Sequence, residues 1–149
     1  MPKEPGRTGK AGGRSFMAEA QRALPEDPAL QDPHNIDAEQ GLIASCLIDG
    51  TGDVLSECFS RGIQGDVFYH PQHKVLFDAI QRLFEDGKPI DMIVLTDYLR
   101  SNQLLDAVGG IVYLSQITNR IESTVHARYW IDIVRDKHVL RQLKRTAET

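Results

Sequence analysis

The chain of 149 residues is long enough for one compact domain with a short appendage. Its hydrophobic share of 41% and charged share of 26% are ordinary for a globular protein that can build a core. No apolar run reaches the roughly 18–20 residues that span a bilayer, and the charged, glycine-rich start lacks a hydrophobic signal segment, which disfavours a membrane or secreted protein.

The two cysteines, Cys46 and Cys58, are too few for a disulfide framework and lack metal-ligand spacing. Both stand among apolar residues, which predicts buried thiols in a reducing cytoplasm.

The net charge of −4 is distributed unevenly. Residues 1–14 hold four basic and one acidic side chain, residues 15–119 hold six basic and sixteen acidic ones, and residues 120–145 hold seven basic and three acidic ones. An acidic body repels phosphate, so any nucleic-acid surface is expected in the last segment. A solvated helix face is the commoner meaning of such charges.

In chain order, residues 1–32 are rich in Gly, Pro and basic residues without apolar periodicity, and are predicted to be a disordered tail. Order is expected from "PHNIDAEQ", where either Asn35 or Asp37 caps a helix. Apolar residues that recur at helical spacing predict one inward face, formed by Ile36, Ile43, Cys46 and Leu47. "DVLSECFSRG" predicts a second, shorter helix that stops at Gly62.

Pro71 suits the first position of a further helix. The apolar stripe of that helix is Val75, Leu76, Ala79, Ile80, Leu83 and Phe84. Asp91 is expected to cap a helix with Val94, Leu95, Tyr98 and Leu99 facing inward. A helix carrying Ile111, Leu114 and Ile117 follows, and Ser123 is expected to cap a long final helix that reaches about Arg145. With no convincing strand, the fold class is predicted to be all-α.

The final helix is apolar on more than one side. A stripe of Val125, Tyr129, Ile133, Leu140 and Leu143, with Trp130 at its edge, leaves Ile131 and Val139 well outside it. Such a helix favours more than one neighbour, and a partner subunit would supply the second. Single exposed apolar residues are also normal.

Gly109 and Gly110 could mark a phosphate-binding loop, but a P-loop also needs a Lys and a hydroxyl residue at fixed spacing. No basic residue lies between Arg100 and Arg120. The pair is therefore interpreted as a tight turn into a helix.

His70 and His73 could contribute to a zinc site, but zinc needs three or four ligands and no suitable partner stands near in sequence. The preferred interpretation is a helix start with His73 exposed. Acidic residues such as Asp37, Asp53 and Asp91 stand at helix starts, where they complement the helix dipole. No active site is predicted.

Four stretches together resemble the N-terminal domain of DnaB-type bacterial replicative DNA helicases: "PHNIDAEQGLIASCLID", "DVFYHPQHKVLFDAIQRLFEDGKPIDMIVLTDYL", "LLDAVGGIVYLSQI" and "YWIDIVRDKHVLRQL". Within them, P-H-x-x-x-A-E-Q, F-Y-x-x-x-H, G-x-P-I-D and D-x-V-G-G-x-x-Y-L resemble family signatures in the family's order. The likeness extends over roughly residues 33–149.

The resemblance implies a compact helical head at 33–106 followed by a helical hairpin at 107–149. In the family, hairpins pair to form dimers, three dimers make the collar of a hexamer, and the collar receives primase; a helicase loader is a further partner left open. The residues expected to make the hairpin contacts are Leu114, Ile117, Trp130, Ile133, Val134, Val139 and Leu140.

The family's ATP-dependent 5′–3′ motor, with its ATP and Mg²⁺ sites, lies in a C-terminal domain that this chain does not contain. The chain is therefore expected to be non-catalytic, to hold no cofactor, and to act in the cytoplasm at the replication fork, with DNA contacted mainly by the motor. Two alternatives stay open: a free-standing adaptor that binds DNA through residues 120–145, and a small hydrolase built on His70 and His73.

Overall fold

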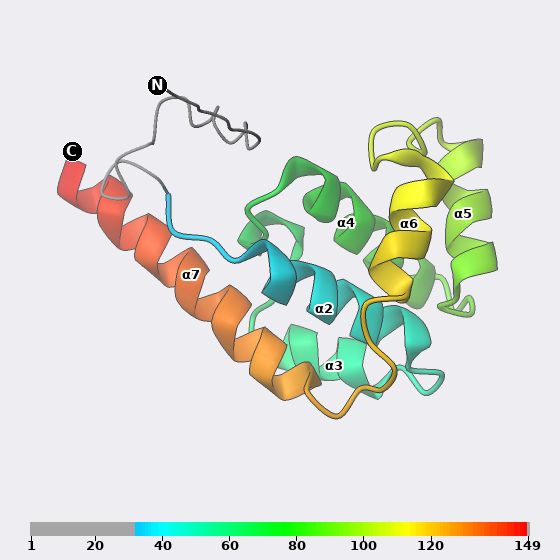
Figure 1. Ribbon diagram of the computed structural model, residues 1–149, viewed down its shortest axis with the longest axis horizontal. Helices are drawn as coiled ribbons and strands as arrows, with labels where there is room; N and C mark the ends of the chain where they lie inside the picture. Colours follow the sequence, from blue (N-terminus) through cyan, green and yellow to red (C-terminus); the bar gives the residue numbers. More distant parts are fainter. Residues whose placement is uncertain (1–31, 149) are drawn as a thin grey trace, which may run out of the picture. The chain divides into compact units, whose positions relative to one another are not determined.

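The computed structural model describes residues 32–148, and the regular structure within that range is helical throughout (Figure 1). The helices are α2 (Ile36–Ile48), α3 (Asp53–Ser60), α4 (Pro71–Glu85), α5 (Met92–Ser101), α6 (Gly110–Thr118) and α7 (Ala127–Glu148), with one 3-10 turn, η2 (Gly65–Val67). The predicted all-α class is confirmed. The predicted tail falls, apart from Asp32, outside the described residues. Within the described range, no helix is both long and apolar enough to cross a bilayer.

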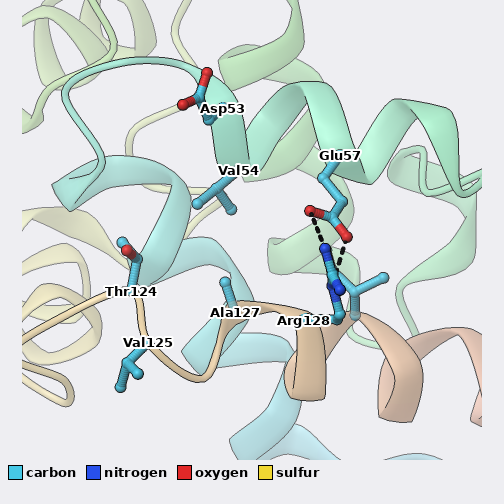
Figure 2. A pocket seen from close by; sticks show the side chains of 8 residues that line it. Asp53, Val54, Glu57, Thr124, Val125, Ala127 and Arg128 are labelled. Atoms are coloured by element: carbon cyan, nitrogen blue, oxygen red, sulfur yellow. Dashed lines mark hydrogen bonds and ion pairs between the residues drawn. The ribbon is translucent and has the colours of Figure 1, made fainter.

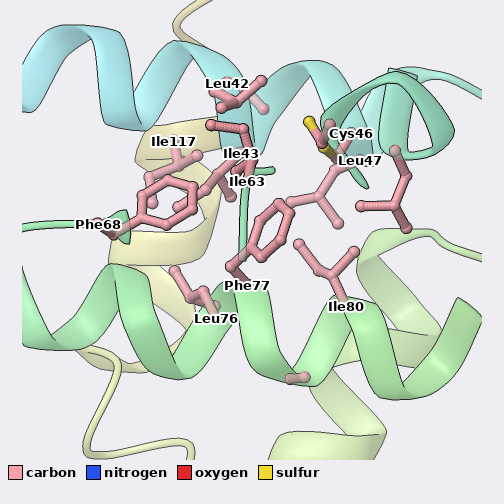
Figure 3. Packing of buried hydrophobic residues seen from close by; sticks show 14 of the residues in the cluster. Leu42, Ile43, Cys46, Leu47, Ile63, Phe68, Leu76, Phe77, Ile80 and Ile117 are labelled. Carbon is pink, nitrogen blue, oxygen red and sulfur yellow. The ribbon is translucent and has the colours of Figure 1, made fainter. Parts of the chain in front are cut away.

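Helix α2 is the centre of the core. Helices α3, α4, α6 and α7 all contact it, and residues 38–47 are buried without a break. In Figure 3, Ile43 of α2 points toward Leu76 and Phe77 of α4, and all three side chains are fully buried. The prediction of a single inward face on α2 was therefore wrong, because neighbouring helices cover this helix on several sides.

The helix starts follow local capping chemistry. Asn35, rather than Asp37, caps α2, since its side-chain oxygen accepts a hydrogen bond from the Ala38 amide at 3.0 Å. Pro71 begins α4, and Asp91 accepts from the Val94 amide at 2.8 Å, both as predicted. Helix α7 begins at Ala127, later than the predicted cap at Ser123, which instead holds a turn before the helix.

The two helices expected to form a hairpin, α6 and α7, both pack on α2, and any contact between them is minor (Figure 1). In the single chain they share the core of the preceding helices, and residues 33–149 form one compact unit. The division into a head at 33–106 and a pairing hairpin at 107–149 concerns the assembled protein and stays a prediction.

Candidate functional site

Helix α7 turns one face into the core and is held there at both ends. Ile131 and Val134 are buried, as is Arg141, whose guanidinium donates to the carbonyl oxygens of Pro33 (2.8 Å) and Val67 (2.5 Å). The same guanidinium lies 5.5 Å from the centroid of the Tyr69 ring. A guanidinium cannot lose its proton at neutral pH, so Arg141 is buried as a charged group. Its contacts with the two carbonyls and the ring compensate for the free energy lost when the charge leaves water. This arrangement ties the C-terminal half of α7 to η2 and to the segment before α2.

The opposite side of α7 carries large apolar side chains that the rest of the described chain leaves uncovered. The residues of this exposed apolar face are Tyr129, Val139, Leu140 and Leu143. Val125, in the turn before the helix, is also exposed, but it lines the cleft between α3 and the start of α7. Val125 is 76% exposed, and both Tyr129 and Leu143 are 60% exposed. The prediction that α7 is apolar on more than one side is confirmed, and Ile131, outside the predicted stripe, faces the core. The predicted stripe was wrong at two positions: Val139 lies on the exposed face, and Ile133 packs against the core.

A cleft of about 390 Å³ separates α3 from the start of α7 (Figure 2). Apolar Val54, Ala127 and Ile131 contribute to its lining. At its edge the Arg128 Nε donates to Glu57 Oε2 at 2.9 Å. Arg61, directly after α3, also pairs with Asp132 of α7. These surface pairs each contribute little stability but fix the direction in which α7 leaves the loop before it.

Beneath the surface, four side chains from α2, α4 and α6 form a buried hydrogen-bonded chain. His73 Nδ1 lies 2.7 Å from Glu39 Oε1, and His73 Nε2 lies 2.7 Å from the Tyr113 hydroxyl. The Gln40 amide donates to that hydroxyl at 3.0 Å. The backbone amides of Tyr69 and His70 also donate to the Glu39 carboxylate. The prediction of an exposed His73 was wrong: it is fully buried, since Glu39 and Tyr113 satisfy both ring nitrogens.

The electrostatics of Glu39 follow from these contacts. Burial alone would raise its pKa, but the hydrogen bonds from His73 and from the Tyr69 and His70 amides outweigh burial, and the pKa lies below its ordinary value of 4.5. A carboxylate that is 2% exposed and fully hydrogen-bonded acts as an anchor for the turn between η2 and α4.

Three of the four motifs that carry the family resemblance thus meet in one place. Glu39 and Gln40 come from A-E-Q, His73 ends F-Y-x-x-x-H, and Tyr113 follows the two glycines. His34 of the first motif stacks on Tyr69 of the second, with ring centroids 4.1 Å apart. These signatures therefore describe a packing arrangement that locks α2, α4 and α6 together.

Gly109 and Gly110 serve the same arrangement. Their φ angles of +101° and +76° are in the left-handed region that favours glycine. A Cβ on Gly109 would lie 2.9 Å from the Cβ of Tyr113, so the glycine lets the chain pass close to the tyrosine of the buried network. The interpretation as a tight turn into a helix is confirmed.

The seven residues predicted for hairpin contacts occupy three environments. Leu114, Ile117 and Val134 are buried in the core of the chain itself, and Trp130 and Ile133 are half-buried against that core. Val139 and Leu140 are on the exposed apolar face. Only the last two are freely available to a partner in the described chain, and the interface role of the whole set stays a prediction.

Two other predictions concern cysteine and metal. Cys46 and Cys58 are free and buried, as predicted, and a hydrogen bond between the thiols together with burial raises the pKa of Cys46. Residues 32–148 contain no group of three or more His, Cys, Asp or Glu side chains that could hold a metal ion.

Sequence reasoning missed three features that position α7 and the network: the buried His73, the buried Arg141, and the contact between Gly41 and Trp130. Arg141 could have been found, because it falls on the same helical face as Ile131 and Val134. The partner of His73 is distant in the sequence, and no local pattern indicates it.

Comparison with known proteins identifies the family. The DnaB-like helicase N terminal domain matches residues 31–136. The chain is 34% identical over 117 residues to the replicative DNA helicase DnaC of Bacillus subtilis, which covers 78% of this chain and 25% of that protein. It is 34% identical over 118 residues to the replicative DNA helicase DnaB of Leifsonia xyli, with the same two shares. The chain thus spans about a quarter of the length of these relatives.

Solved structures share the fold. The crystal structure of the N-terminal domain of DnaB helicase from Mycobacterium tuberculosis matches with a TM-score of 0.74 and 29% identity, covering 79% of this chain and 80% of that one. A DnaB-like replicative helicase described with its interactions with primase matches with a TM-score of 0.66 and 22% identity, covering 76% of this chain and 26% of that one. The chain belongs to the family of DnaB-like helicase N-terminal domains.

A pH prediction follows from the network. A carboxylate with a lowered pKa contributes stability that is present above its ordinary value of 4.5 and is lost as the pH falls through the lowered value. We therefore expect the unfolding free energy of the chain to exceed that of Glu39→Gln above pH 4.5, and the difference to shrink below it. Urea unfolding of both proteins, followed by circular dichroism at pH values above and below 4.5, measures this difference in unfolding free energy. A difference that does not change with pH would contradict the assignment.

Proposed function

We propose that this chain acts as the collar domain of a replicative DNA helicase, where it joins helicase subunits and docks primase. Family membership supports the setting, and the exposed apolar face of α7 supports the joining role. We include primase as a partner because of the family and because the similar DnaB-like helicase structure is described with its interactions with primase. A helicase loader is a further partner of the same proposal.

The enzymatic part of the proposal concerns the portion of the related helicases that this chain does not match. We assign ATP and Mg²⁺ binding, strand separation and most DNA contact to a motor domain outside this chain. We place the parent enzyme in the cytoplasm at the replication fork. The chain itself is proposed to be non-catalytic and to bind no cofactor.

The observation that carries the joining role is the position of the exposed apolar face. It lies opposite the face that holds Ile131 and Val134 in the core, so α7 has its buried side chains on one side and its large exposed apolar side chains on the other. Covering these large apolar side chains would release free energy of about 25 cal/mol per Å² of apolar surface removed from water. A second α7 offers a surface of the same character, and paired identical surfaces are the commonest way in which oligomers form.

This refines the residues that we assign to subunit contacts. Val139 and Leu140 stay in the set, while Tyr129 and Leu143 join it from the same face. Leu114, Ile117 and Val134 stabilise the fold of each subunit, and changes to them would test folding rather than association.

The test is a Leu140→Asp variant with Ile93→Asp as its matched control. Leu140 is on the exposed apolar face, whereas Ile93 is an 81% exposed residue of α5 on another element. Because a paired interface would bury the new carboxylate, we expect Leu140→Asp to weaken self-association about 100-fold. Sedimentation equilibrium measures it, with circular dichroism to show that both variants fold. Equal association by the two variants would refute the assigned surface.

The alternative of a DNA-binding adaptor is less well supported. At least three of the seven basic side chains in residues 120–145 are engaged within the chain. Arg120 pairs with Asp37, Arg128 pairs with Glu57, and Arg141 binds two backbone carbonyls. These contacts reduce the charge that the segment can offer to phosphate groups.

A further inference from the structure

A close approach of α7 to α2 depends on a glycine in the middle of α2. A Cβ built on Gly41 would lie 2.8 Å from Cε2 of Trp130 and 3.0 Å from Cδ2 and Nε1. Real Cβ atoms essentially never approach other heavy atoms as closely as 2.8 Å. Glycine inside a helix makes the helix less stable than alanine would. At Gly41 the packing of the indole ring against α2 offsets this loss of helix stability.

Trp130 connects this contact to the exposed apolar face. Its ring lies 5.3 Å from the ring of Tyr129, the neighbouring residue, which belongs to that face. Trp130 also lies edge-on to His126 at 6.4 Å, in the turn before α7. Any displacement of the indole ring would therefore move the first turn of α7 and the Tyr129 ring with it.

Arg141 holds the same helix further along through the carbonyls of Pro33 and Val67. With one contact in the first turn and one in the C-terminal half, the rotation of α7 about its own axis is fixed, and so is the direction in which the exposed apolar face points. We propose that Gly41 is a positioning residue for self-association: by leaving room for Trp130, it orients the exposed apolar face of α7. This inference rests on the proposed function, because it assumes that this face joins subunits.

The test compares Gly41→Ala with Gly50→Ala in the full chain. A Cβ on Gly50 would meet nothing within 4 Å, so this variant controls for the change from glycine to alanine. The chain has one tryptophan, so the fluorescence of Trp130 reports its surroundings directly. We expect Gly41→Ala to shift the Trp130 emission and to weaken self-association about tenfold, while Gly50→Ala changes neither.

A second pair of variants separates positioning from a general loss of stability. Phe has a smaller ring than Trp and lacks the indole nitrogen, so Trp130→Phe should make room for a methyl group. We expect the double variant Gly41→Ala with Trp130→Phe to associate about as well as Trp130→Phe alone, which a double-mutant cycle records as coupling between the sites. If Gly41→Ala fails to fold, Trp130→Leu carries the test, since it removes the ring without adding an atom to α2, and it should also weaken association.

The outcomes are distinguishable. If the unmutated chain self-associates and Gly41→Ala associates equally well, the positioning role is overturned and the proposed function stands. Additive effects of Gly41→Ala and Trp130→Phe would overturn it as well. If the unmutated chain is monomeric at high micromolar concentration, the proposed function fails and this inference fails with it.

Discussion

Glu39→Ala is expected to lower the unfolding free energy of the chain by about 3–5 kcal/mol, because it leaves buried hydrogen-bond donors without an acceptor. His73 Nδ1 and the backbone amides of Tyr69 and His70 all lie within 3.3 Å of the Glu39 carboxylate oxygens. Water cannot replace the carboxylate readily, since the residue is 2% exposed and His73 is fully buried.

Denaturant unfolding of Glu39→Ala beside Asp97→Ala measures this effect. Asp97 is an exposed carboxylate of α5, so its removal should change stability by less than about 0.5 kcal/mol. A loss of stability in Glu39→Ala no larger than that in Asp97→Ala would show that the buried network does not hold α2, α4 and α6 together.

Arg141→Met is expected to cost about 2–4 kcal/mol, because the carbonyls of Pro33 and Val67 lose a charged donor in a buried position. Methionine keeps the apolar part of the side chain, so the effect reports mainly on the guanidinium. Hydrogen exchange should rise in the C-terminal half of α7, while exchange in α4 stays close to that of the unmutated chain.

Arg135→Met is the control for this prediction, since Arg135 is an exposed basic residue of the same helix. Replacing a buried charged group by an apolar side chain is neutral or stabilising in some proteins. A stable Arg141→Met variant with unchanged exchange in α7 would therefore mean that Ile131, Val134 and Trp130 alone hold the helix.

The helices with one clear apolar stripe could be predicted from the sequence. In α4, Pro71 marks the start and five of the six predicted stripe residues are buried or half-buried, while Phe84 stands at the exposed margin. In α5, Asp91 caps the helix and Leu95 and Leu99 are buried. Local periodicity and capping decide such elements, because one side of the helix is apolar and the other polar.

Helices α2 and α7 could be located from the sequence but not oriented. When a helix is apolar on two sides, periodicity cannot tell which side faces the core. In α7 the side that faces the core depends on long-range contacts such as Trp130 with Gly41 and Arg141 with Val67. The buried Glu39–His73 pair joins residues far apart in the sequence, so no local pattern could indicate it. Family signatures located these residues, and the structure supplies their physical role.

The central claim is that the exposed apolar face of α7 joins copies of this domain. Sedimentation equilibrium of the unmutated chain from low to high micromolar concentration tests it most directly. The account predicts a concentration-dependent shift from monomer to dimer. A chain that stays monomeric at the highest concentration would contradict it.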